Sequence, residues 1–198
     1  MTLDDAAIER LVKQSRDGDA QAFGHLFDYY SEPVYRYIAS RVRRPSDAED
    51  LTQTVFVKAL EALPRYESRG VPFGGWLFRL ARNAVIDFVR TNRQHADIAD
   101  AVEHSDNGTS PDEIVATRQW IEAIRSALAT LTDDQRDAIA LRFFAGLSAR
   151  ETAEAMGRQE GTVRGLQFRA IAALRRQLLI EAEGDVTTVA TVFGRPTP

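Results

Sequence analysis

The chain has 198 residues, of which 44% are hydrophobic, and it contains no cysteine. This length suits one large or two small domains, and the apolar content is sufficient for packed cores. The lack of cysteine excludes disulfides, thiolate zinc sites and a cysteine nucleophile, and His25, His95 and His104 lack the spacing of metal ligands. There is no apolar run near about eighteen residues and no basic-then-apolar leader, so we expect a cytoplasmic protein without a membrane span, metal or cofactor.

The charge of the chain is unevenly distributed. The formal net charge of -4 argues against a uniformly basic nucleic-acid binder. Residues 64–93, however, carry six arginines and two acids, a net of +4, whereas residues 94–116 carry six acids and no lysine or arginine, a net of -6. A local field matters more to a polyanion than the total charge. The pattern predicts basic regions separated by an acidic connector.

Apolar residues at helical spacing cover most of the first 93 residues. They predict helices over 3–15, 20–44 and 46–63, and Pro33 is expected to kink or break the second. Ser46 and Glu49 predict a capping box at the start of the third helix. Residues 65–75 hold three glycines and a proline, which predicts a loop, and helical spacing resumes over 76–93.

The polar face of this fourth predicted helix carries arginines, an asparagine and Asp87. Cationic side chains follow the backbone of an unpaired strand, and aromatic rings stack on its bases, so the face suits single-stranded nucleic acid. For the nearby rings of Phe73, Trp76 and Phe88 a place in the core is the alternative, and the arginines would then be merely solvated. Tyr66, on the predicted loop, is the better candidate for a stacking ring.

The second half of the chain begins with residues that lack periodicity. Residues 94–110 predict a flexible acidic linker that contains the domain boundary. Pro111 and the two acids after it predict the start of a helix that runs to about residue 130. A further helix is predicted from Leu131 to Gly146, and the polar tail after residue 183 is expected to be disordered.

Residues 146–176 predict two helices joined by a tight turn, as in a DNA-binding helix-turn-helix. Ser148 and Glu151 have the spacing of a capping box, Gly157 can take the positive φ that ends a helix, and Gly161 and Thr162 open the second helix. The second helix has an apolar face and an arginine-rich face. Arginine and glutamine form bidentate pairs with guanine and adenine, so this face suits a major groove; an amphipathic packing helix with a solvated arginine face is the alternative.

Two blocks of the sequence resemble a known family. The first, D-A-E-D-L-T-Q-T-V-F-V-K-A-L followed by F-x-x-W-L-F-R-L-A-R-N-A-V-I-D-F-V-R, resembles region 2 of bacterial sigma factors. The second, from L-T-D-D-Q-R-D-A-I-A-L-R-F-F-A-G-L-S to G-T-V-R-G-L-Q-F-R-A-I-A-A-L-R, resembles region 4. With only these two regions and a short connector, the chain resembles a group IV, extracytoplasmic-function sigma factor. The resemblance implies an all-α protein with region 2 over 1–93, a linker over 94–112, region 4 over 113–183 and a disordered tail over 184–198.

The resemblance also implies a function and its residues. The protein would be a non-enzymatic factor that binds core RNA polymerase, recognises the −35 and −10 promoter elements and promotes strand opening. The residues that match the −10 positions are Tyr66, Arg79, Arg82, Asn83, Asp87, Arg90 and Arg93. The residues that fall on the −35 helix are Thr162, Arg164, Gly165, Gln167, Phe168 and Arg169. The residues expected to bind polymerase are Asp47, Asp50, Gln53 and Lys58.

The partners implied are the β′ clamp helices and β flap of polymerase, promoter DNA and an anti-sigma factor. Anti-sigma factors are often membrane-bound, and such a partner would hold this protein at the membrane; no small-molecule substrate is implied. Two other functions fit parts of the sequence. A response-regulator type of transcription factor shares the helix-turn-helix pattern but needs a receiver domain with strands. A helical adaptor would bind polymerase or an anti-sigma factor without touching DNA.

Overall fold

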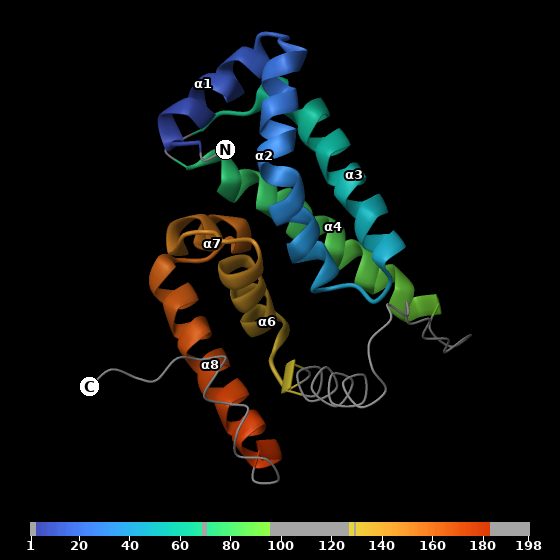
Figure 1. The fold of residues 1–198 in the computed structure, drawn as a ribbon, viewed down its shortest axis with the longest axis vertical. Helices are drawn as coiled ribbons and strands as arrows, with labels where there is room; N and C mark the ends of the chain where they lie inside the picture. Colours follow the sequence, from blue (N-terminus) through green and yellow to red (C-terminus); the bar gives the residue numbers. More distant parts are fainter. Residues whose placement is uncertain (1–2, 69–70, 96–126, 129, 183–198) are drawn as a thin grey trace, which may run out of the picture. The chain divides into compact units, whose positions relative to one another are not determined.

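The computed structural model describes residues 3–68, 71–95, 127–128 and 130–182, and the elements in these residues are all helical (Figure 1). The expected all-α class is confirmed. By their contacts the residues fall into two compact units, Met1–Asp100 with Asp137–Arg164, and Ala101–Arg136 with Gly165–Pro198. The predicted linker, most of the helix predicted from Pro111 and the predicted tail lie outside the described residues. In the described part, no helix is long and apolar enough to cross a membrane.

The first unit opens with α1 (Asp5–Arg16) and α2 (Ala20–Ala39), which follow each other closely. Each begins after an aspartate, Asp4 or Asp19, whose carboxylate accepts a hydrogen bond from a free backbone N–H at 2.7 or 2.8 Å. Pro33 lies inside α2 and neither ends nor divides the helix. Buried side chains before and after it pack against the neighbouring helices, and this packing outweighs the backbone hydrogen bond that proline removes.

The next elements are α3 (Pro45–Ala62) and the short 3-10 helix η1 (Leu63–Arg65). The predicted capping box of Ser46 and Glu49 is wrong, because the helix begins at Pro45 and its N-cap, Arg44, makes no side-chain cap bond. A proline at the first helical position has its φ already set for a helix and lacks the N–H that would need a partner there. The proline therefore fixes the start, and the serine lies inside the first turn.

The long helix α4 (Phe73–His95) starts three residues earlier than the glycine-rich sequence predicts. Gly74 and Gly75 lie in its first turn, where they face α7 (Ala149–Met156). A Cβ at Gly75 would lie 3.1 Å from the Cβ of Glu154, closer than packed carbons usually approach. The glycines thus permit a close helix contact rather than a loop.

The core of the first unit is formed by the inward faces of α2, α3 and α4. Its fully buried side chains include Leu26, Val34, Tyr37, Ile38, Val55, Leu77, Phe78 and Val85. All of these residues except Phe78 have the helical apolar spacing that the sequence predicts. Phe27 and Leu60 also have that spacing, but they are 41% and 53% exposed.

The described C-terminal elements are α6 (Asp133–Ile139), a π-helical turn η2 (Ala140–Phe144), α7, and α8 (Glu160–Ala182). The predicted pair of helices with a tight turn is confirmed. Gly157 adopts φ +61° directly after α7, as the sequence predicts, and ends that helix. The second helix begins at Glu160, just before the predicted start.

Candidate nucleic-acid interface

The helix-turn-helix begins with the predicted capping box. The Ser148 hydroxyl accepts from the Glu151 N–H at 3.2 Å, and the Glu151 carboxylate accepts from the Ser148 N–H at 2.8 Å. Behind the cap, Ala153 and Val163 are buried where the two helices meet. The small side chain and the caps fix the start of α8 relative to α7.

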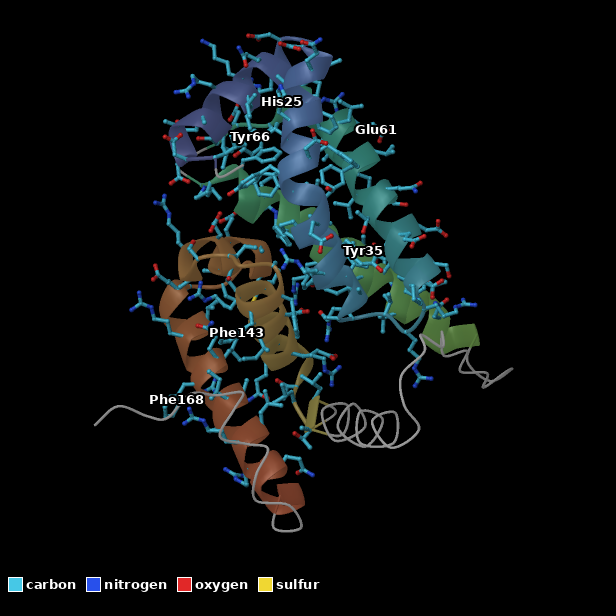
Figure 2. All side chains as sticks on the ribbon, viewed as in Figure 1. His25, Tyr35, Glu61, Tyr66, Phe143 and Phe168 are labelled. Carbon is cyan, nitrogen blue, oxygen red and sulfur yellow. The ribbon has the colours of Figure 1, made fainter. Side chains whose placement is uncertain are left out.

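The outer face of α8 carries the residues predicted for duplex DNA. Arg164, Phe168 and Arg169 are exposed, and the ring of Phe168, with 77% of its surface exposed, projects from the helix (Figure 2). Thr162 is also exposed, and Gln167 is half-buried. An exposed ring between two guanidinium groups offers apolar and charged contacts to base edges and phosphates.

Two further features of the outer face of α8 bear on DNA binding, an ion pair at Arg164 and the open space around Gly165. Arg164 is paired with Glu160 one turn earlier in α8, with 2.5 Å between Nη2 and Oε1. Gly165 has open space around it, because a Cβ there would meet no atom within 4 Å among the described residues. No packing contact in this structure therefore requires a glycine at this position.

The polar face of α4 carries four exposed residues predicted for the −10 strand, Arg79, Asn83, Asp87 and Arg90. They recur at helical spacing and so share one side of the helix. Arg90 is paired with Asp87 at 3.0 Å, which leaves Asn83 as an exposed amide between charged neighbours. The side chain of Arg93 lies outside the described residues.

Tyr66 does not lie on an exposed loop as expected. It follows η1, is only 6% exposed, and its ring packs against Phe73 at right angles and against Trp76, with centroids 5.6 and 4.7 Å apart. Its hydroxyl donates to the carbonyl oxygen of Val71 at 3.3 Å, and burial raises the pKa of this hydroxyl above its ordinary value. Of the other rings, Phe73 is buried, whereas Trp76 and Phe88 are half-buried.

The surface of α3 combines the predicted polar residues with apolar ones that the sequence did not predict to be exposed. Asp50, Gln53 and Lys58 are exposed, whereas Asp47 is half-buried and pairs with Arg44 at 3.1 Å. Val57 and Leu60 are exposed on the same helix by 56% and 53%. Such apolar groups beside charged ones are typical of a protein-binding surface.

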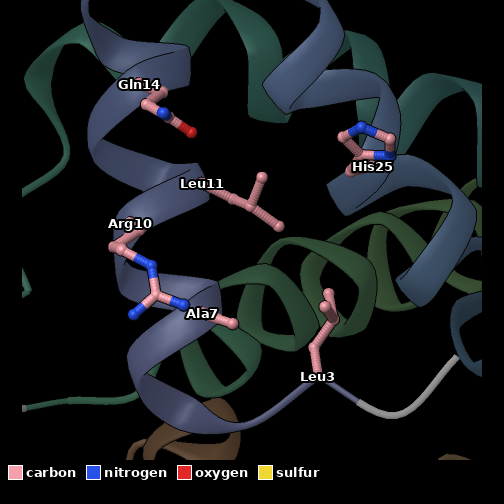
Figure 3. A pocket seen from close by; sticks show the side chains of 6 residues that line it. All are labelled: Leu3, Ala7, Arg10, Leu11, Gln14 and His25. Atoms are coloured by element: carbon pink, nitrogen blue, oxygen red, sulfur yellow. The ribbon is translucent and has the colours of Figure 1, made fainter.

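A pocket of about 210 Å³ opens between α1 and α2 (Figure 3). It is lined by Leu3, Ala7, Arg10, Leu11, Gln14 and His25. His25, which lacks metal-ligand neighbours in the sequence, is the lining residue that comes from α2. None of the predicted site residues lines the pocket.

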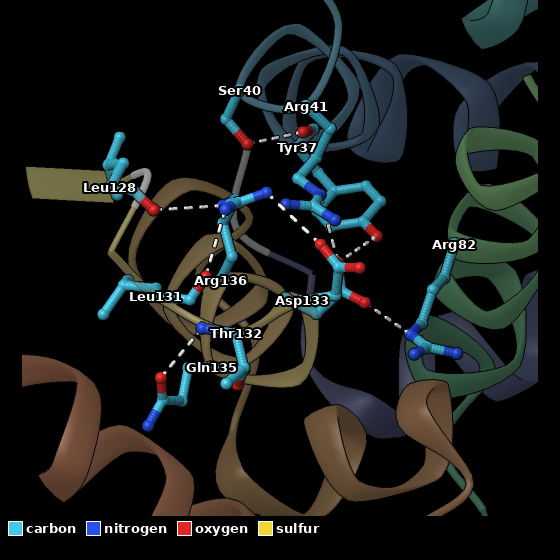
Figure 4. Close-up of polar contacts among 11 residues, drawn as sticks. Tyr37, Ser40, Arg41, Arg82, Leu128, Leu131, Thr132, Asp133, Gln135 and Arg136 are labelled. Carbon is cyan, nitrogen blue, oxygen red and sulfur yellow. Dashed lines mark hydrogen bonds and ion pairs between the residues drawn. The ribbon is translucent and has the colours of Figure 1, made fainter. Parts of the chain in front are cut away.

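Sequence reasoning missed a buried ionic cluster in the first unit. Nε of Arg82 donates to Oδ2 of Asp137 at 2.7 Å, Nε of Arg41 lies 3.1 Å from Oδ1, and the Tyr37 hydroxyl donates to Oδ1 at 3.2 Å (Figure 4). Arg82 is thus half-buried rather than on the exposed face with the other predicted arginines. A signal was present, because Asp137 lies four residues before the apolar Leu141 and so on the apolar side of the helix that the sequence predicts from Leu131 to Gly146.

Comparison with known proteins gives matches over both halves of the chain. Residues 26–95 match the family Sigma-70 region 2, and residues 127–176 match Sigma-70, region 4. The extracytoplasmic-function (ECF) RNA polymerase sigma factor BldN of Streptomyces coelicolor is 37% identical over 177 residues, which cover 88% of this chain and 67% of that protein. The ECF sigma factor ShbA of Streptomyces griseus is 35% identical over 178 residues, or 85% and 93% of the two chains.

Two solved structures are similar to this chain over most of its length. One is CnrH in complex with the cytosolic domain of CnrY, with a TM-score of 0.67 and 26% identity over 89% of this chain and 99% of that chain. The other is the sigma factor RpoE in complex with the anti-sigma factor NepR from Bartonella quintana, with a TM-score of 0.62 and 25% identity over 82% and 99%.

Proposed function

Because this chain belongs to the extracytoplasmic-function sigma factors of the sigma-70 family, we propose that it binds core RNA polymerase, recognises −35 and −10 promoter elements and promotes strand opening. The observation that carries the proposal is the capped helix-turn-helix whose second helix exposes Arg164, Phe168 and Arg169 together. The protein itself performs no catalysis in this scheme, since polymerase supplies the chemistry. Its site of action is the cytoplasm.

Recognition of the −35 duplex is assigned to α8. Arg164 and Gln167, in its early turns, reach base edges, and Arg169 holds a phosphate. Phe168 supplies an apolar contact, for example to a thymine methyl group. Arg164 must leave Glu160 to reach DNA, which requires little free energy because the pair is exposed.

Capture of the opened −10 strand is assigned to α4. The exposed amide of Asn83 has donors and acceptors for the edge of an unpaired base, and Arg79 and Arg90 are placed to hold the phosphates on either side. Tyr66 supports this surface from beneath, since its buried ring fixes Trp76 and Phe73. Strand opening then depends on capture of the unpaired base, which offsets unstacking costs of a few kcal/mol.

Polymerase binding is assigned to α3, where Asp50, Gln53 and Lys58 are exposed beside Val57 and Leu60. The β′ clamp helices are the partner on this surface, and the β flap binds the C-terminal region. An anti-sigma factor is a further partner, supported by the similarity to RpoE, which was solved with the anti-sigma factor NepR. A linker between two DNA-reading parts raises the effective concentration of the second contact once the first has formed.

The other two functions have less support. A response-regulator type of factor needs a receiver domain, but residues 26–95 match sigma region 2 instead. A helical adaptor would have no use for exposed arginines on both α4 and α8. A promoter shift assay with core enzyme distinguishes the adaptor, because only a DNA-binding factor gives a salt-dependent shift.

The test reconstitutes the full chain with core RNA polymerase and maps transcript starts on genomic DNA. Defined start sites are expected, and their absence would reject the function. Asn83→Ala should lower permanganate reactivity of the −10 region while −35 duplex binding persists, and Asn92→Ala, an exposed asparagine on the same helix, is the matched control. Normal melting with Asn83→Ala would reject the assignment of α4.

A further inference from the structure

Arg41 and Arg82 form an anion site whose present occupant fits it incompletely. The Asp137 side chain, 2% exposed, neutralises both guanidinium groups. Nε of Arg41 is nevertheless buried without an acceptor in hydrogen-bonding geometry among the described residues, although Oδ1 lies 3.1 Å away. A buried donor left in this state is unfavourable. A tetrahedral phosphate, with oxygens pointing in more directions than those of a carboxylate, suits two convergent arginines better.

The half-buried anion site adjoins the exposed surface of α4 assigned to the −10 strand. Arg82 lies on α4 directly before Asn83 and three residues after Arg79. An unpaired strand that follows this helix would therefore pass Arg82, provided that Asp137 were absent. The Asp137 carboxylate occupies the contacts with the two arginines that a phosphate of the strand would need.

The segment that carries Asp137 is held in place by α7. Arg79 on α4 is paired with Glu154 on α7 at 3.2 Å. Next to this pair, the lack of a side chain at Gly75 lets α7 approach, since a Cβ would lie 3.3 Å from the backbone oxygen of Glu151. Only the end of α6, η2 and a short turn separate Asp137 from α7, so we expect the two contacts on α4 to form and break together.

We propose that Arg41 and Arg82 bind a backbone phosphate of single-stranded DNA and that Asp137 is the internal occupant of this phosphate site. Docking of the segment with Asp137 and binding of the unpaired strand then exclude each other. The segment must move away before the strand can occupy the arginines. The inference rests on the proposed function, because that function supplies the opened strand.

Asp137→Asn is the direct test, and Asp133→Asn is its matched control. Asp133 lies in the same helix but is 68% exposed and pairs with Arg136, so both variants lose one negative charge. The full chain is titrated against a fluorescent single-stranded oligonucleotide and against its duplex, with fluorescence anisotropy as the readout. Asp137→Asn should bind the single strand tighter by about fivefold or more, a coupling of ordinary size for linked sites. The duplex affinity, and Asp133→Asn on either DNA, should stay near the parent values.

A second variant tests the inference without a change of charge. Gly75→Leu pushes α7 away from α4 and should also tighten single-strand binding, whereas Gly24→Leu should not, because a Cβ at Gly24 meets no atom within 4 Å among the described residues. Adding Arg41→Gln to Asp137→Asn should abolish the gain in single-strand affinity.

Circular dichroism establishes that each variant is folded. If Asp137→Asn does not fold, the comparison of Gly75→Leu with Gly24→Leu decides the matter.

A folded Asp137→Asn that binds the single strand no tighter than Asp133→Asn would overturn the inference. An equal gain on single strand and duplex would also overturn it, since that indicates a general charge effect. The proposed function is judged separately by Asn83→Ala. If Asn83→Ala impairs promoter opening while Asp137→Asn gains nothing, the function stands and only the internal competition is wrong.

Discussion

Replacing Tyr66 by alanine tests whether this ring supports the −10 surface from within. The ring is 6% exposed and contacts Phe73 and Trp76. Truncating a buried aromatic side chain to alanine typically costs about 3 to 5 kcal/mol. That is a large part of the roughly 5 to 15 kcal/mol by which domains are stable. Tyr66→Ala should therefore unfold at a urea concentration lower by more than about 1 M, followed by far-ultraviolet circular dichroism of the full chain.

Tyr66→Phe separates packing from chemistry. It keeps the ring and removes only the hydroxyl that donates to Val71 at 3.3 Å, so it should cost no more than about 1.5 kcal/mol and leave promoter opening intact. Asn83→Ala should show the opposite pattern, with stability within about 0.5 kcal/mol of the parent and impaired opening. An unchanged urea midpoint for Tyr66→Ala would refute the buried role. Loss of opening in a stable Tyr66→Phe would show that the hydroxyl contacts DNA.

Three further predictions concern an exposed ring, a helical glycine and a buried tyrosine. Phe168→Ala should leave the thermal midpoint nearly unchanged but weaken binding to −35 duplex in a gel-shift titration, because the ring is 77% exposed; equal affinity would remove Phe168 from the interface. Gly165→Ala should stabilise the fold by about 0.5 to 1 kcal/mol in urea unfolding and weaken duplex binding if the backbone approaches DNA there; parent-like affinity would show that it does not. Burial, and then the charge of Asp137, raise the pKa of Tyr37 well above its ordinary value of 10.0, so the unfolded chain loses this proton first and the free energy of unfolding should fall as pH rises above about 10. That fall should be shallower in Tyr37→Phe, and identical slopes would contradict the assignment.

The helices could be predicted because their signals are local. The apolar stripes of α2 and α4 repeat at the helical period, and Ser148 with Glu151 and Gly157 marks the ends of α7 by hydrogen bonding and backbone geometry within a few residues. The resemblance to sigma factors then assigned the polar faces of these helices to polymerase, to the −10 strand or to the −35 duplex. The outer residues of α8 were correctly placed for the same reason, since alternation between faces is a property of one helix.

What the sequence did not show depends on residues far apart in the chain. Gly74 and Gly75 predicted a loop because their partner, α7, lies more than seventy residues later and its approach leaves no local trace. Arg82 was grouped with exposed arginines because its carboxylate partner, Asp137, is 55 residues away. Tyr66 was expected on a loop, yet it is buried by rings on both sides of the glycine-rich stretch.

Four of the arginines proposed to contact DNA are paired with a carboxylate in the described part of the chain, and burial decides which pairs matter. The pairs are Arg79 with Glu154, Arg82 with Asp137, Arg90 with Asp87 and Arg164 with Glu160. Exposed pairs are worth at most about 1 kcal/mol and break easily when a phosphate arrives. Removing one partner of a buried pair costs about 3 to 5 kcal/mol. Arg82 therefore does not release Asp137 and bind DNA while the segment that carries Asp137 is still docked. The buried pair is therefore the one whose release must be driven by another binding event, such as the docking of the chain on polymerase.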